Sequence, residues 1–122
     1  MGKVRAATIA AVLAAAAPAA QAASWKPVGS SVDSRPYESI AQLMKSGLRN
    51  VHGFRVAAGP AGAKVGGEVM CLTGGIDSQS YTFGWTVGRT RVKVLKASGT
   101  CTVVAEATLR RGGSVTVTVW MR

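Results

Sequence analysis

The pattern of apolar and polar residues predicts one helical segment near the start of the folded part of the chain. Between Ser34 and Gly47 the apolar residues recur every three to four positions, which is typical of one face of a helix. Ser34 suits the N-cap, Pro36 the first turn and Gly47 the stop. We therefore expect a short amphipathic helix that covers a sheet with its apolar face. That face consists of Ile40, Leu43 and Met44.

The rest of the chain alternates between apolar and polar residues, which predicts strands and turns. The first extended segment surrounds Phe54, and its alternation fails at Gly53, where we expect a β-bulge. The glycine-rich residues 57–67 are expected to form a loop, and a second strand follows at 68–73.

Cross-strand register predicts a hairpin around residues 88–89. A two-residue loop there places Trp85 opposite Val92 on an apolar face and leaves Arg91 and Lys93 on the solvent face. One continuous strand would instead mix aromatic and basic side chains on the same face. The hairpin is therefore the better interpretation of this segment.

A second hairpin is predicted between residues 100–110 and the last strand. A three-residue loop at 111–113, with a glycine in the left-handed conformation, pairs Leu109 with Val115. The same register gives each strand an inward and an outward set of residues. The inward residues are Cys101, Val103, Ala105, Ala107 and Leu109, and Val115, Val117, Val119 and Met121 of the last strand, whose outward residues are Thr116, Thr118 and Trp120. Both hairpins together place their turns at the same end of the sheet.

The expected fold class is α+β. It consists of a short N-terminal helix packed on an antiparallel β-meander of about five or six strands, curled into either a small barrel or a sandwich. Residues 23–34 are expected to form an extended N-terminal arm or an early edge strand, and residues 35–122 a single domain.

Residues 1–22 have the features of a secretory signal peptide. Lys3 and Arg5 precede an apolar run over residues 6–17, and Ala20-Gln21-Ala22 is a small-x-small cleavage signal. The run is shorter than the roughly 20 residues that cross a bilayer. We therefore expect export to the periplasm or the exterior, and a mature chain without a transmembrane segment.

Two cysteines, Cys71 and Cys101, occur in the chain. In an oxidising compartment they predict one intramolecular disulfide. Val69 and Cys71 share a face of the second strand, and Cys101 points toward that face. Closing a loop of about 30 residues stabilises a domain by roughly 3.5 to 4 kcal/mol in the chain-entropy model.

The chain is strongly basic, with a formal charge of +10 that falls to +8 without Lys3 and Arg5. Such a balance favours acidic partners, either an acidic protein or an anionic component of the cell envelope. Nucleic acid is the least accessible of the anionic partners outside the cytoplasm. The candidate binding residues are the basic groups of the two predicted hairpins and their turns: Arg89, Arg91, Lys93, Arg110 and Arg111.

Catalytic patterns are missing from the sequence. The mature part holds five carboxylates without a pairing that suits general acid–base work, and His52 is the single histidine of the chain. No metal, cofactor or catalytic residue is therefore predicted. The sequence favours an exported, non-enzymatic binding protein that uses a basic face. The alternative is a structural or self-assembling surface subunit that uses the terminal strand 114–120; neither hypothesis fixes the oligomeric state.

Overall fold

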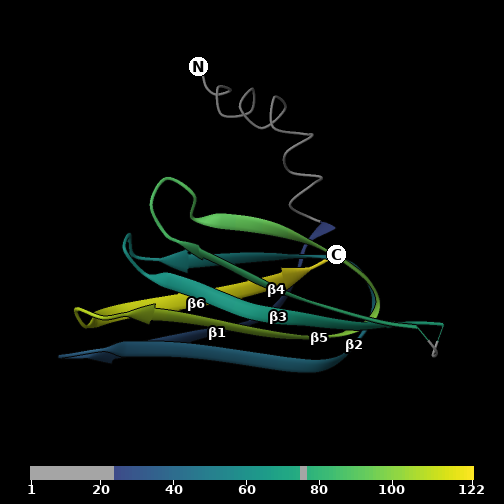
Figure 1. The fold of residues 1–122 in the computed structure, drawn as a ribbon, viewed down its shortest axis with the longest axis horizontal. Coiled ribbons are helices and arrows are strands. Elements are labelled where there is room, and N and C mark those ends of the chain that lie inside the picture. The colour runs from purple at the N-terminus through teal and green to yellow at the C-terminus, as the bar shows by residue number, and fades with distance from the viewer. Residues whose placement is uncertain (1–23, 75–76) are drawn as a thin grey trace, which may run out of the picture.

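The computed structural model describes residues 24–74 and 77–122, and the expected signal peptide lies outside them. These residues form a single antiparallel sheet of six strands in the order β1-β6-β2-β5-β3-β4 (Figure 1). The strands are β1 (Lys26–Arg35), β2 (Ser39–Gly59), β3 (Lys64–Thr73), β4 (Asp77–Thr86), β5 (Val92–Leu109) and β6 (Gly113–Met121).

Two long strands, β2 and β5, fold this sheet into two layers. Residues 39–48 of β2 pair with the second part of β5, whose other side pairs with β3. The end of β2, residues 53–59, pairs with the first part of β5 and with β6. Register shifts between Lys45 and Gly53 mark the bend, and they include the bulge expected at Gly53.

We call the half of the sheet that contains β3 and β4 the first layer, and the half that contains β1 and β6 the second layer. The inward faces of the two layers enclose the hydrophobic core. Phe54 is its largest fully buried side chain. The alternating inward positions predicted for the last two strands are confirmed, and all are at most 3% exposed: Val103, Ala105, Ala107, Leu109, Val115, Val117 and Val119.

The expected α+β class is wrong, because the described elements are all strands. The segment expected as a helix is the start of β2. Along it Ser39 and Ala41 are buried while Met44 is 67% exposed, so burial alternates with the period of a strand. The spacing of three large apolar residues was misleading because the small residues Ser39 and Ala41, rather than Ile40 and Met44, fill the core positions.

Both predicted hairpins are also wrong in their pairing. β4 pairs with β3, and the start of β5 pairs with β2. Val92 and Val94 are 46% and 58% exposed, whereas the ammonium nitrogen of Lys93 lies 5.5 Å from the centre of the Trp85 ring. The start of β5 takes its orientation from its pairing with β2 and not from β4, so the two faces of this segment are exchanged relative to the prediction.

The C-terminal strand is an interior strand of the sheet. β6 pairs with β1 along its whole length and with β2 from Thr116 to Met121. The predicted hairpin between residues 100–110 and the last strand does not form, because β5 and β6 lie in opposite layers around Leu109 and Val115. A role in assembly for strand 114–120 would require an open edge, which this strand does not offer along Thr116–Met121.

The predicted disulfide is confirmed. Cys71 and Cys101 lie directly opposite each other in β3 and β5, with their Cα atoms 4.1 Å apart. Both are buried. Disulfides are typical of proteins in oxidising compartments, so the bond fits a protein outside the cytoplasm. No helix within residues 24–74 and 77–122 is long and apolar enough to cross a membrane.

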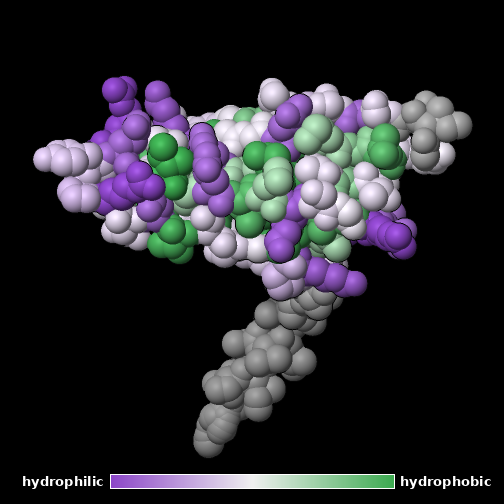
Figure 2. Space-filling model, turned by 90° about the horizontal axis from the view of Figure 1, so that it is seen from below, coloured by the Kyte–Doolittle hydropathy of each residue, from purple (hydrophilic) through white to green (hydrophobic). Residues whose placement is uncertain are grey.

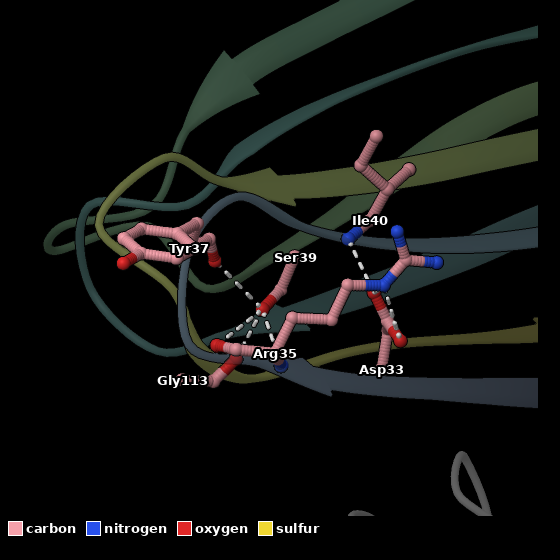
Figure 3. A network of polar contacts seen from close by, with 6 residues as sticks. All are labelled: Asp33, Arg35, Tyr37, Ser39, Ile40 and Gly113. Carbon is pink, nitrogen blue, oxygen red and sulfur yellow. Dashed lines mark hydrogen bonds and ion pairs between the residues drawn. The ribbon is translucent and has the colours of Figure 1, made fainter.

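The turn between β1 and β2 is fixed by a polar network (Figure 3). The buried Ser39 hydroxyl donates to the carbonyl of Gly113 at 2.6 Å and accepts from the backbone N–H of Arg35 at 3.0 Å. The Asp33 carboxylate accepts from the N–H of Ile40 at 2.8 Å and forms an ion pair with Arg35 at 3.0 Å. The network therefore ties β1, β2 and the start of β6 together at one end of the sandwich.

Acid sensitivity of this turn is the first testable consequence. The hydrogen bond from Ile40 lowers the pKa of Asp33 below its usual 3.8, and Arg35 adds to the effect. A carboxylate with a lowered folded-state pKa stabilises the fold above its unfolded-state pKa, and this contribution is lost as the pH falls through the folded-state value. We expect Asp33→Asn to lower the thermal midpoint at pH 7, and the difference from the wild type to disappear as the pH falls below the folded-state pKa of Asp33. A constant difference between the two proteins across this range would contradict the assignment.

Candidate functional site

On the outer face of the second layer, side chains from neighbouring strands form rows of different composition. In the register of the strands, Trp120 of β6 lies beside Arg55 of β2, and Arg55 lies beside Val94 of β5. The next outward row along the same strands contains smaller side chains, with Thr118 beside Ala57 and Ala57 beside Val92. This face therefore combines a row that contains an aromatic and a basic side chain with a row of Thr118, Ala57 and Val92.

Four residues at one end of this face form what we call the Trp–Arg cluster: Trp25, Arg55, Trp120 and Arg122. The guanidinium carbon of Arg55 lies 4.2 Å from the centre of the Trp120 ring and 5.3 Å from that of Trp25. The guanidinium of Arg122 lies 4.6 Å from the Trp25 ring. These distances fall within the range of cation–π contacts. Both arginine side chains are thus held by indole rings rather than extended freely into water.

The backbone next to the bulge in β2 positions Arg122. The N–H of Arg122 donates to the carbonyl of Gly53 at 3.0 Å, and the N–H of Gly53 donates back at 3.2 Å. A Cβ atom at Gly53 would come within 3.3 Å of the Arg122 side chain. Glycine at this bulge therefore leaves room for the guanidinium to reach Trp25.

The side-chain carboxylates of Glu68 and Glu106 lie away from the Trp–Arg cluster. Glu68 and Glu106 are on the outer face of the first layer, where they accept hydrogen bonds from Ser80 and Gln42 at 2.7 and 2.6 Å. Within residues 24–74 and 77–122, the only ion pair is that of Arg35 with Asp33. Charge is therefore segregated, and the arginines of the cluster have no partner among the described carboxylates.

The basic residues predicted from the sequence lie mostly at the opposite end of the sandwich. Arg89 and Arg91 belong to the loop between β4 and β5, and Arg110 and Arg111 to the turn between β5 and β6. Both connections contact residues 60–63: the N–H of Gly62 donates to Val87 O at 2.8 Å, and Arg111 Nη2 donates to Ala61 O at 3.2 Å. Hydrophilic side chains gather at this end, on the left of Figure 2.

These four arginines therefore share one end of the molecule, although the hairpins that led to this expectation do not form. The ammonium group of Lys93 lies over the Trp85 ring, and Trp85 Nε1 donates to Thr90 O between Arg89 and Arg91. We call Arg89, Arg91, Arg110 and Arg111 the loop-end arginines.

The outer face of the first layer carries a different surface. Met44, Met70 and Leu72 are exposed there, and a hollow of about 440 Å³ lies over the pairing of β3 with β4 and β5. The carboxylates of Glu68 and Glu106 border this apolar area. The two faces of the sandwich thus differ in charge, with carboxylates on the first layer and the Trp–Arg cluster on the second.

Titratable side chains lie on the described part of both faces. The described residues contain no group of three or more His, Cys, Asp or Glu side chains that could hold a metal ion. His52 is exposed and lies in β2 next to the bulge. Burial raises the pKa of Tyr81, whose hydroxyl donates to the carbonyl of Lys96, so this phenol stays protonated at neutral pH.

Comparison with known proteins gives distant structural neighbours only. No family model matches the chain, and no curated protein matches it. The carbohydrate-binding module TmCBM61, solved with β-1,4-galactotriose, is 12% identical and has a TM-score of 0.48, over 75% of this chain and 68% of that one. The C-terminal domain of A223, a structural protein of Sulfolobus turreted icosahedral virus, is 7% identical with a TM-score of 0.44, over 80% and 98%.

A third neighbour is the xylan-binding module CBM86 from Roseburia intestinalis, which is 9% identical with a TM-score of 0.38, over 80% of this chain and 88% of that one. The neighbours thus include both binding modules and a structural protein. All three TM-scores are below 0.5.

The Trp–Arg cluster was missed in the sequence because its members come from the start of β1, from β2 and from the chain end. The alternation of the last strand did place Trp120 outward. The neighbour of Trp120, however, is set by the pairing of β2 with β6, which brings Arg55 beside it. A local hairpin register contains no information about such a long-range pairing.

Proposed function

We propose that this protein is a non-enzymatic binding protein that contacts an anionic component of the cell envelope, namely a surface of anionic lipid headgroups, through the outer face of its second layer. The observation that carries this proposal is the Trp–Arg cluster, in which two guanidinium groups rest on indole rings without a described carboxylate partner.

The contacts with the indole rings make Arg55 and Arg122 suitable for binding phosphate. A guanidinium in contact with an indole ring keeps N–H groups available on its other sides, and these can bind the oxygens of a phosphate in a bidentate manner. The ring also restricts the rotamers of the long side chain, which lowers the entropy lost on binding. Arg55 and Arg122 therefore suit a ligand that presents phosphate oxygens at a surface.

The apolar side chains beside the cluster favour a lipid surface over a soluble acidic protein. Val94 lies next to Arg55 in the register and is 58% exposed, and Val92 in the next row is 46% exposed. Tryptophan is enriched where membrane and water meet, because its ring is amphipathic. A headgroup layer accepts the indoles, the valines and the guanidiniums of this face at the same time.

The charge of the whole chain supports the same partner. Its formal value of +10, which is +8 without Lys3 and Arg5, attracts an anionic surface from a distance, and the loop-end arginines are part of this charge. The disulfide fits a compartment in which such a surface is accessible. Export itself remains a prediction from residues 1–22.

Vesicle sedimentation tests the proposal. We expect the oxidised protein to pellet with vesicles that contain phosphatidylglycerol and not with vesicles of phosphatidylcholine alone. The double variant Arg55→Gln/Arg122→Gln should bind about 30-fold more weakly, because each basic group near an anionic surface contributes about 1 kcal/mol. Binding should also decrease between low salt and 1 M salt, where the screening length falls to about 3 Å.

The matched control is Arg110→Gln/Arg111→Gln, which removes the same charge from the loop end. A smaller loss in this control than in the cluster variant supports the second layer as the contact face. An equal or larger loss of vesicle binding in this control would identify the loop-end arginines as the contact face. Binding to soluble polyglutamate but not to anionic vesicles would identify an acidic protein as the partner and would refute the lipid assignment.

A further inference from the structure

We infer that β4 is a self-association edge, through which two copies of this chain pair strand to strand and form a closed dimer with one continuous sheet. This interaction surface is separate from the face proposed to bind lipid. It rests on a difference between β4 and β1, the strands at the two ends of the sheet order.

The β1 edge carries several features that discourage pairing with another strand. β1 begins with Lys26 and Pro27, and its register with β6 shifts between Pro27 and Gly29. Asp33 and Arg35 add charges near its other end. Proline, bulges and charged side chains are the usual means by which natural proteins protect a sheet edge.

The β4 edge has none of these features over most of its length. Residues 78–86 read SQSYTFGWT and contain neither a charged residue nor a proline. The register of β4 with β3 runs without a shift from Thr86 to Asp77, so the strand is regular. In the part of the chain that the structure describes, no strand lies beyond β4. Its free side therefore offers a regular row of backbone donors and acceptors.

Side chains of β4 leave that row accessible. The outward positions hold small polar residues such as Ser80 and Thr82, whereas Tyr81 and Trp85 are tied to the start of β5. The Tyr81 hydroxyl donates to Lys96 O, and Trp85 Nε1 donates to Thr90 O at 3.0 Å. These two bonds hold the aromatic side chains toward the sandwich and away from an approaching strand.

A second copy of the chain is the occupant that these features fit. The protein is strongly basic, so two copies repel each other over most of their surface, but an uncharged strand lets them meet without like charges in contact. Antiparallel pairing of β4 with itself is isologous and uses both free edges. Because β1 is protected, association should stop at the dimer instead of continuing into fibres.

Concentration-dependent mass measurement tests this inference. We expect light scattering and sedimentation of the oxidised protein to show a monomer–dimer equilibrium within the range of about 1 μM to 1 mM. In a pair centred on Thr82, the two copies of this residue face each other. Thr82→Lys should therefore raise the dissociation constant at least tenfold, and so should Thr82→Glu. Mixing these two variants should restore a dimer.

The matched control is Thr102→Lys, which adds the same charge to the same face but in β5, an interior strand, and should leave the dimer unchanged. A wild type that stays monomeric up to about 1 mM would overturn the inference. So would a dimer that is insensitive to Thr82→Lys, or an assembly that grows beyond two copies. If Thr82→Lys is monomeric and still binds vesicles, lipid binding does not require the dimer, so the two proposals are tested independently.

Discussion

A variant without the Cys71–Cys101 disulfide is expected to lose about 3.5 to 4 kcal/mol of its free energy of unfolding. The two cysteines are 30 residues apart in sequence, and cross-linking a loop of this size removes that amount of chain entropy from the unfolded state. For a domain of about 100 residues this is a large part of the total stability. Denaturant unfolding of Cys71→Ala/Cys101→Ala beside the wild type provides the measurement.

The position of the bond makes the expectation specific. Both sulfurs are buried, so alanine also removes packed atoms from the core. Wild-type protein unfolded under reducing conditions retains these atoms and therefore separates the loss of the cross-link from the loss of packing. A double variant as stable as the oxidised wild type would show that the bond contributes little to the fold.

The second large effect is expected at Phe54. This side chain is completely buried at the point where β2 pairs with Leu95 of β5 on one side and Met121 of β6 on the other. Truncating a buried phenylalanine to alanine costs about 3 to 5 kcal/mol, because both the transfer energy and the filled volume are lost. We expect Phe54→Ala to unfold at a much lower denaturant midpoint than the wild type.

Phe83→Ala is the matched control for this substitution. Phe83 packs against the core from β4 but is only partly buried, so its truncation should cost clearly less. Equal losses at the two positions would contradict the assignment of Phe54 as the centre of the core. A binding assay on the same variants would test a consequence for the site, because Arg55 follows Phe54 in β2 and depends on its packing.

Local alternation was sufficient to predict which residues of the last two strands are buried. Val103, Ala105, Val115 and Val117 all point into the core as expected. The disulfide was predictable as well, because two cysteines allow a single pairing. The buried positions depend on the period of a strand, and the disulfide depends on the number of cysteines. Neither requires knowledge of the partner strands.

Strand partners could not be obtained in this way. A hairpin is the simplest local explanation of two adjacent strands, but here β4 and β5 are separated by β3, and β5 and β6 lie in opposite layers. The outward position of Val94 follows from the pairing of β5 with β2 and not from the adjacent sequence. The Trp–Arg cluster has the same origin, so the candidate site was as inaccessible to local reasoning as the topology.

The pairing of β1 with β6 joins the first strand of the fold to the last, with Lys26 opposite Met121. A growing or partly translocated chain therefore has no partner for its first strand until the final residues have emerged. Contacts between residues so distant in sequence form late and slow the folding reaction. The pairing of β1 with β6 is therefore expected to be the last step that completes the sheet.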